Sequence, residues 1–347
     1  RPRRLKREGH LWTLELPRSP LAISLERDLS FDPIYPRYIE LIERTLHKFR
    51  PDLIHITGPS EVGILGTYLA WKLNLPLVAS WHTNVHEYAA RRMRWLSRRL
   101  GSGGPLVEQW AEDTSLNVAT RFYKLAQVLY APNPPLCDLL ARMTGRPCHL
   151  MQRGVDTELF SPAKRTRAAE DGQPLLGYVG RLSVEKNVDL LPHVDKELRA
   201  IGWSPRWLIV GHGADEAMLR RELGEAAMAG VLRGEELAKA YANMDLLVFP
   251  SHTDTFGNVV LEALASALPA VVTPQGGPAH IVQHGVTGVI ANDEDFAACI
   301  ADLLSSPERL QSMRCAAREY ALGCTWESVF ERMIAAYPVV CRSAVIS

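Results

Sequence analysis

The sequence contains no closely spaced cysteine pair, although it has six cysteines in 347 residues. None has the C-x-x-C spacing of zinc sites and of thiol–disulfide exchange motifs. Cysteines scattered over a chain of this length indicate reduced thiols in a cytoplasmic protein rather than a disulfide framework.

Long hydrophobic runs are also missing. The longest apolar runs, such as LLVFP and PAVVT, are as long as strands, far short of the roughly 20 residues that span a membrane. The chain as given begins at Arg1 without a signal-peptide pattern. No helix-turn-helix, zinc-finger or RNA-recognition signature is present, so we expect no nucleic-acid partner.

Net charge is absent as well, because 39 basic residues balance 39 acidic ones. The balance is uneven along the chain, with +7 over residues 1–150 and −7 over the remainder. A basic first half indicates an anionic partner, such as a membrane surface or an anionic substrate.

What the sequence does contain is a regular alternation of short apolar runs and helical patterns. It predicts strands at 10–16, 52–57, 76–80, 127–132, 175–180, 206–211, 246–251 and 269–273, and helices at 38–49, 62–73, 187–202, 234–244, 258–267 and 295–306. Nearly continuous apolar strands between helices are typical of buried parallel sheets. The predicted fold class is α/β, with two Rossmann-like domains and a cleft between them.

The alternation restarts after a charged segment that contains glycine and proline, residues 152–174. We place the N-terminal domain at 1–160 and the C-terminal domain at 161–325. The first of these domains is expected to lack its first βα unit, because the chain opens without a strand followed by a glycine-rich turn and a helix.

A charged loop follows one of the expected strands. In GRLSVEKNVDLL (180–191), Gly180 permits a tight turn, and Arg181 and Lys186 place two cations before a helix. Cations at the end of a strand that faces a cleft are suited to bind a diphosphate. The alternative is that Arg181 pairs with Glu185 on the surface.

The stretch SHTDTFGNVVLEALAS (251–266) ends a strand and begins a helix. Free N–H groups at the start of the helix favour an anion, so phosphate oxygens are expected near residues 257–259. Glu262 is then placed to accept hydrogen bonds from ribose, and Asp254 to reach a sugar. The alternatives are a helix cap at Asp254 and a solvated Glu262, but the apolar neighbours of Glu262 predict burial, which requires partners. The loop 275–290 is expected to pack beside this helix.

Two further motifs give weaker signals. The G-x-G of VGHGADEAML (210–219) resembles a phosphate loop, but His212 is better explained as a loop residue without a role. The triplet Asp293, Glu294 and Asp295 is of a kind that binds divalent ions, but acidic residues at a helix start are the simpler explanation. We expect no metal site.

In the first half, SWHTNVHEY (80–88) follows an expected strand. His82 and His86 are four residues apart, but no glutamate follows His82, which excludes the H-E-x-x-H zinc pattern. His82 is expected to donate a hydrogen bond to a sugar hydroxyl or a phosphate. Asn84, His86 and Tyr88 are candidate contacts for the acceptor.

The segment RRMRWLSRRL (91–100) mixes arginines with apolar residues. If it is helical, Met93, Leu96 and Leu100 share a face, a pattern that suits a helix lying on an anionic membrane. The alternatives are a solvated arginine helix packed on its own domain and a nucleic-acid patch. The candidate membrane contacts are Arg91, Arg92, Arg94, Trp95, Arg98 and Arg99.

The motifs together resemble the retaining glycosyltransferases of family 4, which have the GT-B fold. The resemblance is carried by GRLSVEKN, AYANMDLLVFPSHTDTFGNVVLEALASALPAVVT and GGPAHIVQHGVTG and runs from about residue 50 to 335. Asp254 and Glu262 are similar to the family's E-x7-E motif, with aspartate in the first place. The TDTFG variant is similar to the branch of sulfoquinovosyldiacylglycerol synthase and of mannosyltransferases with lipid-linked acceptors.

The resemblance implies a UDP- or GDP-sugar as donor substrate, no cofactor and a lipid or sugar acceptor, with peripheral contact at the inner face of the cytoplasmic membrane. Arg181 and Lys186 would hold the diphosphate, Glu262 the ribose, and Asp254 and His82 the sugar. The base would lie near Val231, Leu232 and Arg233. The other implied donor contacts are Gly180, Phe256, Gly257, Asn258 and Val259. A C-terminal helix within 326–347 would cross back to the first domain.

Two departures from the family accompany these similarities. Ala267 stands where the family usually has glycine, so its turn must tolerate a methyl group. The family's first strand and glycine-rich loop are missing, from which we expect weak donor binding and poor turnover; turnover equal to that of a chain with this segment restored would contradict this expectation.

Other functions remain open at this stage. A soluble glycosyltransferase with a small acceptor, a sugar-nucleotide epimerase and a non-catalytic sugar-nucleotide binder all fit the same motifs. Incubation with a sugar nucleotide alone, followed by product analysis, would reveal an epimer.

Overall fold

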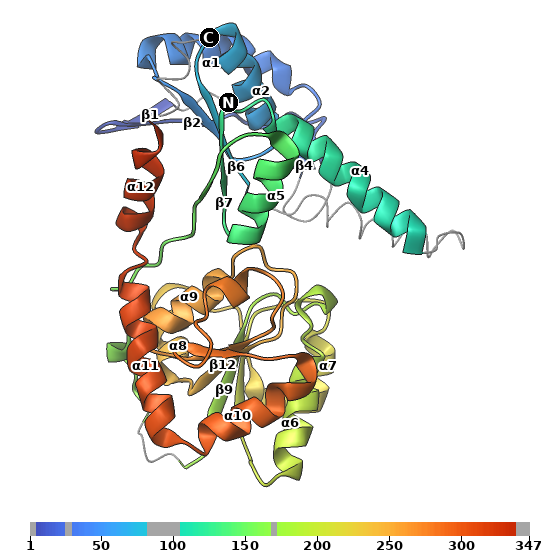
Figure 1. Ribbon diagram of the computed structural model, residues 1–347, viewed down its shortest axis with the longest axis vertical. Coiled ribbons are helices and arrows are strands. Elements are labelled where there is room, and N and C mark those ends of the chain that lie inside the picture. The colour runs from blue at the N-terminus through green and yellow to red at the C-terminus, as the bar shows by residue number, and fades with distance from the viewer. Residues whose placement is uncertain (1–4, 25–29, 82–104, 168–171, 338–347) are drawn as a thin grey trace. The chain divides into compact units, whose positions relative to one another are not determined.

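The computed structural model describes residues 5–24, 30–81, 105–167 and 172–337, and the structural statements below concern these residues. The chain divides into two compact units (Figure 1). The first comprises residues 1–131, 135–149 and 336–347, and the second comprises 132–134 and 150–335. The boundary predicted at 160–161 thus lies within the segment that contacts assign to the second unit.

The first unit contains a four-stranded sheet in the order β5–β6–β7–β8, in which β5, β6 and β7 run parallel. Its strands are β5 (Ile54–Ile56), β6 (Leu77–Ser80), β7 (Val128–Ala131) and β8 (Cys148–Leu150), and its helices are α1 (Ile39–Phe49), α2 (Glu61–Lys72), α4 (Pro105–Tyr123) and α5 (Pro134–Thr144). Before β5 the chain forms two antiparallel pairs, β1 (Leu5–Glu8) with β2 (Leu11–Leu14) and β3 (Ile23–Ser24) with β4 (Ser30–Phe31).

The second unit contains a six-stranded sheet in which all neighbours are parallel. Its order is β11–β10–β9–β12–β13–β14, the doubly wound arrangement of dinucleotide-binding domains. The strands are β9 (Leu175–Val179), β10 (Arg206–Val210), β11 (Met228–Gly230), β12 (Leu246–Phe249), β13 (Ala270–Val272) and β14 (Gly288–Ile290).

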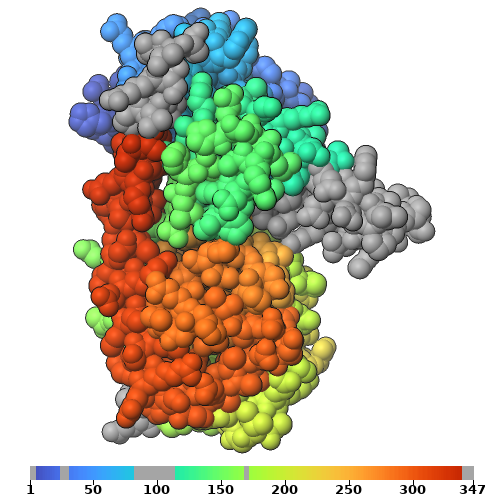
Figure 2. All heavy atoms as spheres, viewed as in Figure 1, coloured from blue at the N-terminus to red at the C-terminus, as the bar shows by residue number. Residues whose placement is uncertain are grey.

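Helices cover both faces of this sheet, with α9 and α10 both in contact with β13 (Figure 1). The helices of this unit are α6 (Leu190–Ala200), α7 (Glu216–Leu223), α8 (Gly234–Asn243), α9 (Asn258–Ala265), α10 (Phe296–Leu304) and α11 (Pro307–Leu322). Helix α12 (Trp326–Ala335) follows α11 and does not cover the sheet. In the space-filling view, residues coloured orange and red, which include α9 to α11, cover much of the visible face of the second unit (Figure 2). Each fully buried Leu, Val or Phe side chain of the core contributes about 1.5–3 kcal/mol.

The structure confirms all eight predicted strands and all six predicted helices. The periodicity did not reveal α11, because its buried positions Met313, Ala317 and Ala321 include two alanines, which give little hydrophobic signal. Helices α4, α5 and α7 and the short strands β1, β3, β4, β8, β11 and β14 were also missed.

The turn after α9 explains how the chain tolerates alanine at position 267. Ala267 has φ 56°, in the left-handed region that favours glycine. Leu268 N–H donates to Ala263 O (2.9 Å) and Ala267 N–H donates to Leu264 O (3.0 Å), which together form a Schellman C-cap. The two hydrogen bonds hold a conformation that costs an L-residue about 1–2 kcal/mol.

The described end of the chain packs within the first unit. Tyr337 OH lies 2.7 Å from His55 Nδ1, and the His55 ring stacks on Tyr130 at 5.6 Å between centroids. His55 Nε2 also contacts Ser80 Oγ. Residues 336–337 therefore belong to the first unit although α12, which precedes them, is assigned to the second.

Candidate functional site

The strand order of the second unit identifies where a ligand is expected to bind. The order of the strands reverses between β9 and β12, which are parallel neighbours although β10 and β11 lie between them in sequence. In open α/β sheets, ligands bind outside the carboxyl ends of the strands at this switch point. The loops that leave β9 and β12 carry the predicted diphosphate and sugar contacts Arg181, Lys186 and Asp254.

The loop after β9 packs closely against the loop after β10. Gly180 has φ 156°, and a Cβ on Gly211 would lie 1.8 Å from Gly180 O, while a Cβ on Gly213 would lie 2.0 Å from Leu182 O. The glycines of the G-x-G motif are thus needed for contact between two backbones. His212 Nδ1 lies 2.5 Å from Glu216 Oε2 on α7.

An ion pair joins the loops after β9 and β12. Lys186 Nζ lies 2.7 Å from Asp254 Oδ1, and both side chains are about one-fifth exposed (20% and 22%). Thr253 Oγ1 donates to Glu185 O (3.0 Å), which adds a second bond between the loops. A cation and a carboxylate are therefore fixed together at the switch point.

One oxygen of this carboxylate is unused. Asp254 Oδ2 is buried and has no hydrogen-bond partner among the residues that the structure describes. A buried carboxylate oxygen without a partner is unfavourable in the free protein, and it is suited to accept a hydrogen bond from a ligand hydroxyl.

The second predicted cation, Arg181, is exposed on the same loop. It forms no ion pair with Glu185 or with any other described residue, so the structure does not support the surface pair considered above. Arg181 is therefore available for an anionic ligand.

Helix α9 begins at Asn258 without a side-chain cap. Its N-cap residue is Gly257, at φ 101°, and Asp254 does not cap it. The Gly276–Gly277 turn packs against this start, because Gly277 N–H donates to Asp254 O (2.6 Å) and a Cβ on Gly277 would lie 2.4 Å from Phe256 Cα. The predicted packing of loop 275–290 beside the helix is present.

Glu262 is largely buried on α9, among apolar neighbours. Tyr241 OH on α8 donates to Glu262 Oε2 (2.9 Å). Burial raises the pKa of Glu262 above its ordinary value, although the hydrogen bond from Tyr241 acts in the opposite direction. Glu262 is therefore not the solvated helix residue considered as an alternative.

The predicted base contacts follow β11 at the same edge of the sheet. Val231 is 58% exposed, Leu232 is half-buried and Arg233 is exposed. The preceding Gly230 has φ 69°, and its carbonyl accepts a hydrogen bond from Gly211 N–H (2.8 Å). This turn therefore presents one exposed apolar side chain, Val231, and one half-buried apolar side chain, Leu232.

Several predicted residues lie outside the described part of the chain. These are His82, Asn84, His86, Tyr88, Arg91, Arg92, Arg94, Trp95, Arg98 and Arg99. The described residue that precedes them, Trp81, is buried at the end of β6.

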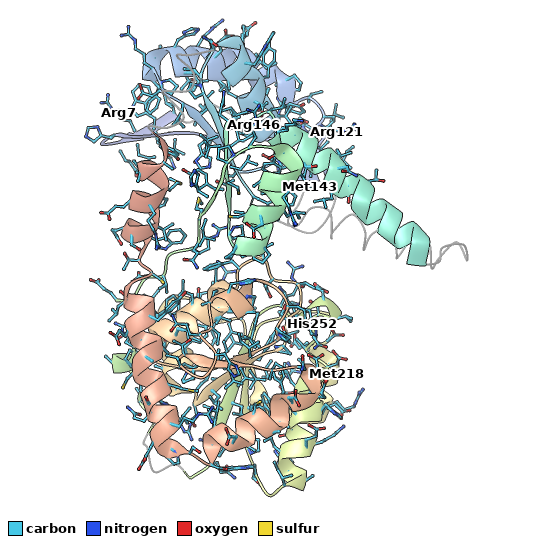
Figure 3. All side chains as sticks on the ribbon, viewed as in Figure 1. Arg7, Arg121, Met143, Arg146, Met218 and His252 are labelled. Carbon is cyan, nitrogen blue, oxygen red and sulfur yellow. The ribbon has the colours of Figure 1, made fainter. Side chains whose placement is uncertain are left out.

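A polar cluster beside the site escaped the sequence analysis. His252, labelled in Figure 3, lies on the loop after β12, with Nε2 3.1 Å from Asp293 Oδ2 and Nδ1 2.9 Å from Gln275 Oε1. Asn187 Nδ2 donates to Asp293 Oδ2 (2.8 Å). The sequence contains one hint of this cluster, which is that Asn187 directly follows the predicted diphosphate contact Lys186.

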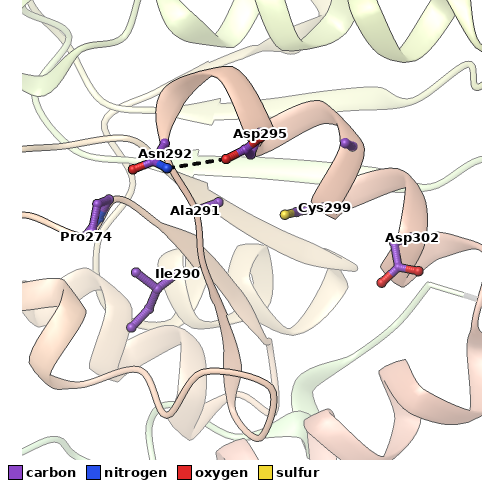
Figure 4. Close-up of a pocket in the computed structure, with 8 residues that line it drawn as sticks. Pro274, Ile290, Ala291, Asn292, Asp295, Cys299 and Asp302 are labelled. Carbon is purple, nitrogen blue, oxygen red and sulfur yellow. Dashed lines mark hydrogen bonds between the residues drawn. The ribbon is translucent and has the colours of Figure 1, made fainter.

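A surface hollow of about 520 Å³ lies beside β14 and α10 (Figure 4). Its lining contains none of the predicted site residues. Its acidic members are Asp295, which accepts a hydrogen bond from Asn292, and Asp302, which pairs with Arg309. Among the described residues, no group of three or more His, Cys, Asp or Glu is arranged to hold a metal ion.

Comparisons with known proteins identify the family. Residues 3–159 match the model of "Glycosyltransferase Family 4", and residues 173–306 match that of "Glycosyl transferases group 1". A GDP-mannose-dependent alpha-mannosyltransferase of Mycobacterium tuberculosis is 32% identical over 86% of this chain and 75% of its own length. A sulfoquinovosyl transferase of Arabidopsis thaliana is 31% identical over 82% of this chain and 57% of its own.

Solved structures support the fold assignment. A sucrose-phosphate synthase of Thermosynechococcus elongatus superimposes with a TM-score of 0.74 at 20% identity, over 99% of this chain and 86% of the other. Anabaena HepE in complex with UDP-glucose superimposes with a TM-score of 0.66 at 17% identity, over 87% and 82%. With the sequence matches, these show that the chain belongs to glycosyltransferase family 4, hexosyltransferases of GT-B fold that transfer sugar from nucleotide sugars.

Proposed function

We propose that this glycosyltransferase transfers a mannosyl residue from GDP-mannose to a hydroxyl acceptor with retention of configuration and without a metal ion. The observation that carries the proposal is the Lys186–Asp254 pair beside the uncapped start of α9. The donor is inferred from the 32% identical relative, which is named GDP-mannose-dependent.

Each part of the donor has a matching group at the switch point. Lys186 and Arg181 bind the diphosphate, together with the first amides of α9. Glu262 accepts hydrogen bonds from the ribose. Asp254 Oδ2, which is buried without a partner among the described residues, accepts one from a sugar hydroxyl. The other proposed donor contacts are Gly180, Val231, Leu232, Phe256, Gly257, Asn258 and Val259. The family resemblance adds His82.

The reaction depends on stabilising the leaving group. The bond between the sugar C1 and the phosphate oxygen breaks, and negative charge grows on the departing diphosphate. Fixed cations and helix amides stabilise this charge without reorganising. The acceptor oxygen forms its bond to C1 on the same face, and its proton passes to the departing phosphate oxygen.

The acceptor is proposed to be a lipid or a lipid-linked sugar, reached at the inner face of the cytoplasmic membrane. No described helix is long and apolar enough to cross a bilayer. Membrane contact is assigned to the arginines of segment 91–99 because that segment mixes arginines with apolar residues. Asn84, His86 and Tyr88 are assigned to the acceptor.

Vesicle co-sedimentation tests the membrane contact. We expect the chain to sediment with vesicles that contain anionic lipid and to remain in the supernatant with neutral ones, because arginines near an anionic surface contribute about 1 kcal/mol each. Replacing the five arginines of 91–99 by serine should abolish sedimentation. Equal sedimentation of both proteins would show that these arginines do not make the contact, and no sedimentation of either would favour a soluble enzyme with a small acceptor.

A thermal-shift screen tests the donor. GDP and GDP-mannose are expected to raise Tm, since a ligand at about 100 times its Kd stabilises the folded state by about 2.7 kcal/mol. UDP and UDP-glucose serve as matched controls and should raise Tm less. A larger shift with the uridine ligands would contradict the proposed donor while leaving the family unaffected.

A further inference from the structure

Asn187 holds an unusual backbone conformation directly after Lys186. It has φ 54° and ψ 36°, in the left-handed region that residues with a side chain rarely adopt, with asparagine among the exceptions. It ends the short 3-10 turn Val184–Lys186, in which Lys186 N–H donates to Ser183 O (2.8 Å). The direction of the Lys186 side chain therefore depends on how firmly this turn is held.

The Asn187 side chain is anchored to a distant part of the sequence. Its Nδ2 donates to Asp293 Oδ2 at 2.8 Å. Asp293 follows β14 and is half-buried, whereas Glu294 and Asp295 beside it are exposed. All three acidic residues lie in the first turn of the segment that leads into α10, as a helix-start role predicts, but none of their side chains caps it.

His252 completes the anchor from the loop after β12. Its Nε2 lies 3.1 Å from Asp293 Oδ2, and because a carboxylate oxygen only accepts, this is a hydrogen bond when Nε2 carries the proton. Asn187 Nδ2 lies 3.1 Å from His252 Nε2, and in this protonation state both nitrogens donate to the same oxygen, Asp293 Oδ2. Asp293 thus holds the Lys186 loop and the Asp254 loop at a single atom.

We propose that Asp293 is a positioning residue for nucleotide-diphosphate binding, which fixes Lys186 through Asn187 and His252. The inference depends on the role of Lys186 in the proposed function. Asp293 acts by holding the two loops whose side chains meet in the Lys186–Asp254 pair. Its loss would leave the cation present but free to move.

The test is a double-mutant cycle on GDP binding, measured by calorimetry. Asp293→Ala is expected to weaken GDP binding about tenfold, but by less than about twofold when Lys186 is already methionine, because residues that act through one another are not additive. The sign is informative, since removing a carboxylate near an anion site would by itself tighten GDP binding. Glu294→Ala, the exposed neighbour of equal charge, is the matched control and should show no loss.

Asn187→Gly is a second variant, and we expect it to fold because the position has a left-handed backbone conformation. Glycine adopts the left-handed conformation readily but lacks the amide, so the same coupled loss of about tenfold is expected. Equal losses with and without Lys186, or no loss for either variant while Lys186→Met still weakens binding, would overturn this inference alone. Failure of the unmutated chain to bind GDP while it binds UDP would overturn the proposed donor alone, and the same cycle is then measured with UDP; failure to bind either nucleotide would overturn both.

Discussion

Replacing Lys186 by methionine is expected to lower kcat by about 10²–10³-fold, the usual effect of removing one preorganised group that stabilises transition-state charge. Methionine keeps the length and the apolar stem of lysine but not its charge. The ammonium group is 2.7 Å from Asp254 and one-fifth exposed, so water replaces it poorly. The rate of GDP release with saturating donor measures the effect.

Two further variants separate chemistry from stability. Lys196→Met removes a cation from a surface pair with Glu222, where the lysine is 68% exposed, and should leave kcat unchanged. Lys186→Met leaves Asp254 without its cation, which is itself destabilising; adding Asp254→Asn removes that charge and should not restore kcat. A kcat for Lys186→Met within about threefold of the unmutated chain would refute the assigned role.

Glu262→Gln is expected to stabilise the free protein at neutral pH and to weaken GDP binding roughly 10–100-fold, the loss of about 1.5–3 kcal/mol in charge-assisted hydrogen bonds. Glutamine retains an acceptor for the Tyr241 hydroxyl, which lies 2.9 Å from Glu262 Oε2, and so keeps the local packing. Stability rises and GDP affinity falls because the buried negative charge of Glu262 destabilises the folded protein but strengthens its hydrogen bonds to the ribose.

The stability effect should depend on pH in a defined direction. Burial raises the folded-state pKa of Glu262, so below its unfolded value of about 4.3 the carboxyl is neutral in both states and costs nothing. As pH rises through the folded pKa, the folded state loses stability. The Tm advantage of Glu262→Gln should therefore be present at pH 7–8 and disappear near pH 4.

Thermal melts across this pH range and calorimetric titration with GDP measure the two effects. Glu236→Gln, at an exposed position of α8, is the matched control and should change neither. An advantage that persists at pH 4, or unchanged GDP affinity, would show that Glu262 does not act through a buried charge at the ribose.

The sequence by itself determined the type and place of most elements. Strands such as 246–249 are apolar throughout, and a run buried on both faces needs no further information to be recognised. It also determined which side chains bear charge at strand ends, since Arg181, Lys186 and Asp254 each follow such a run. Elements with small or few buried residues, such as α11, gave too little periodicity to be found.

Only the tertiary structure decided which of these charges meet. Lys186 and Asp254 are 68 residues apart, and they come together because β9 and β12 are neighbours in the sheet. The same holds for Tyr241 with Glu262 and for Asn187 with Asp293, which lie on different elements. Local pattern fixes strands and helices, whereas strand order depends on long-range pairing, so the partners of a charged side chain cannot be read along the chain.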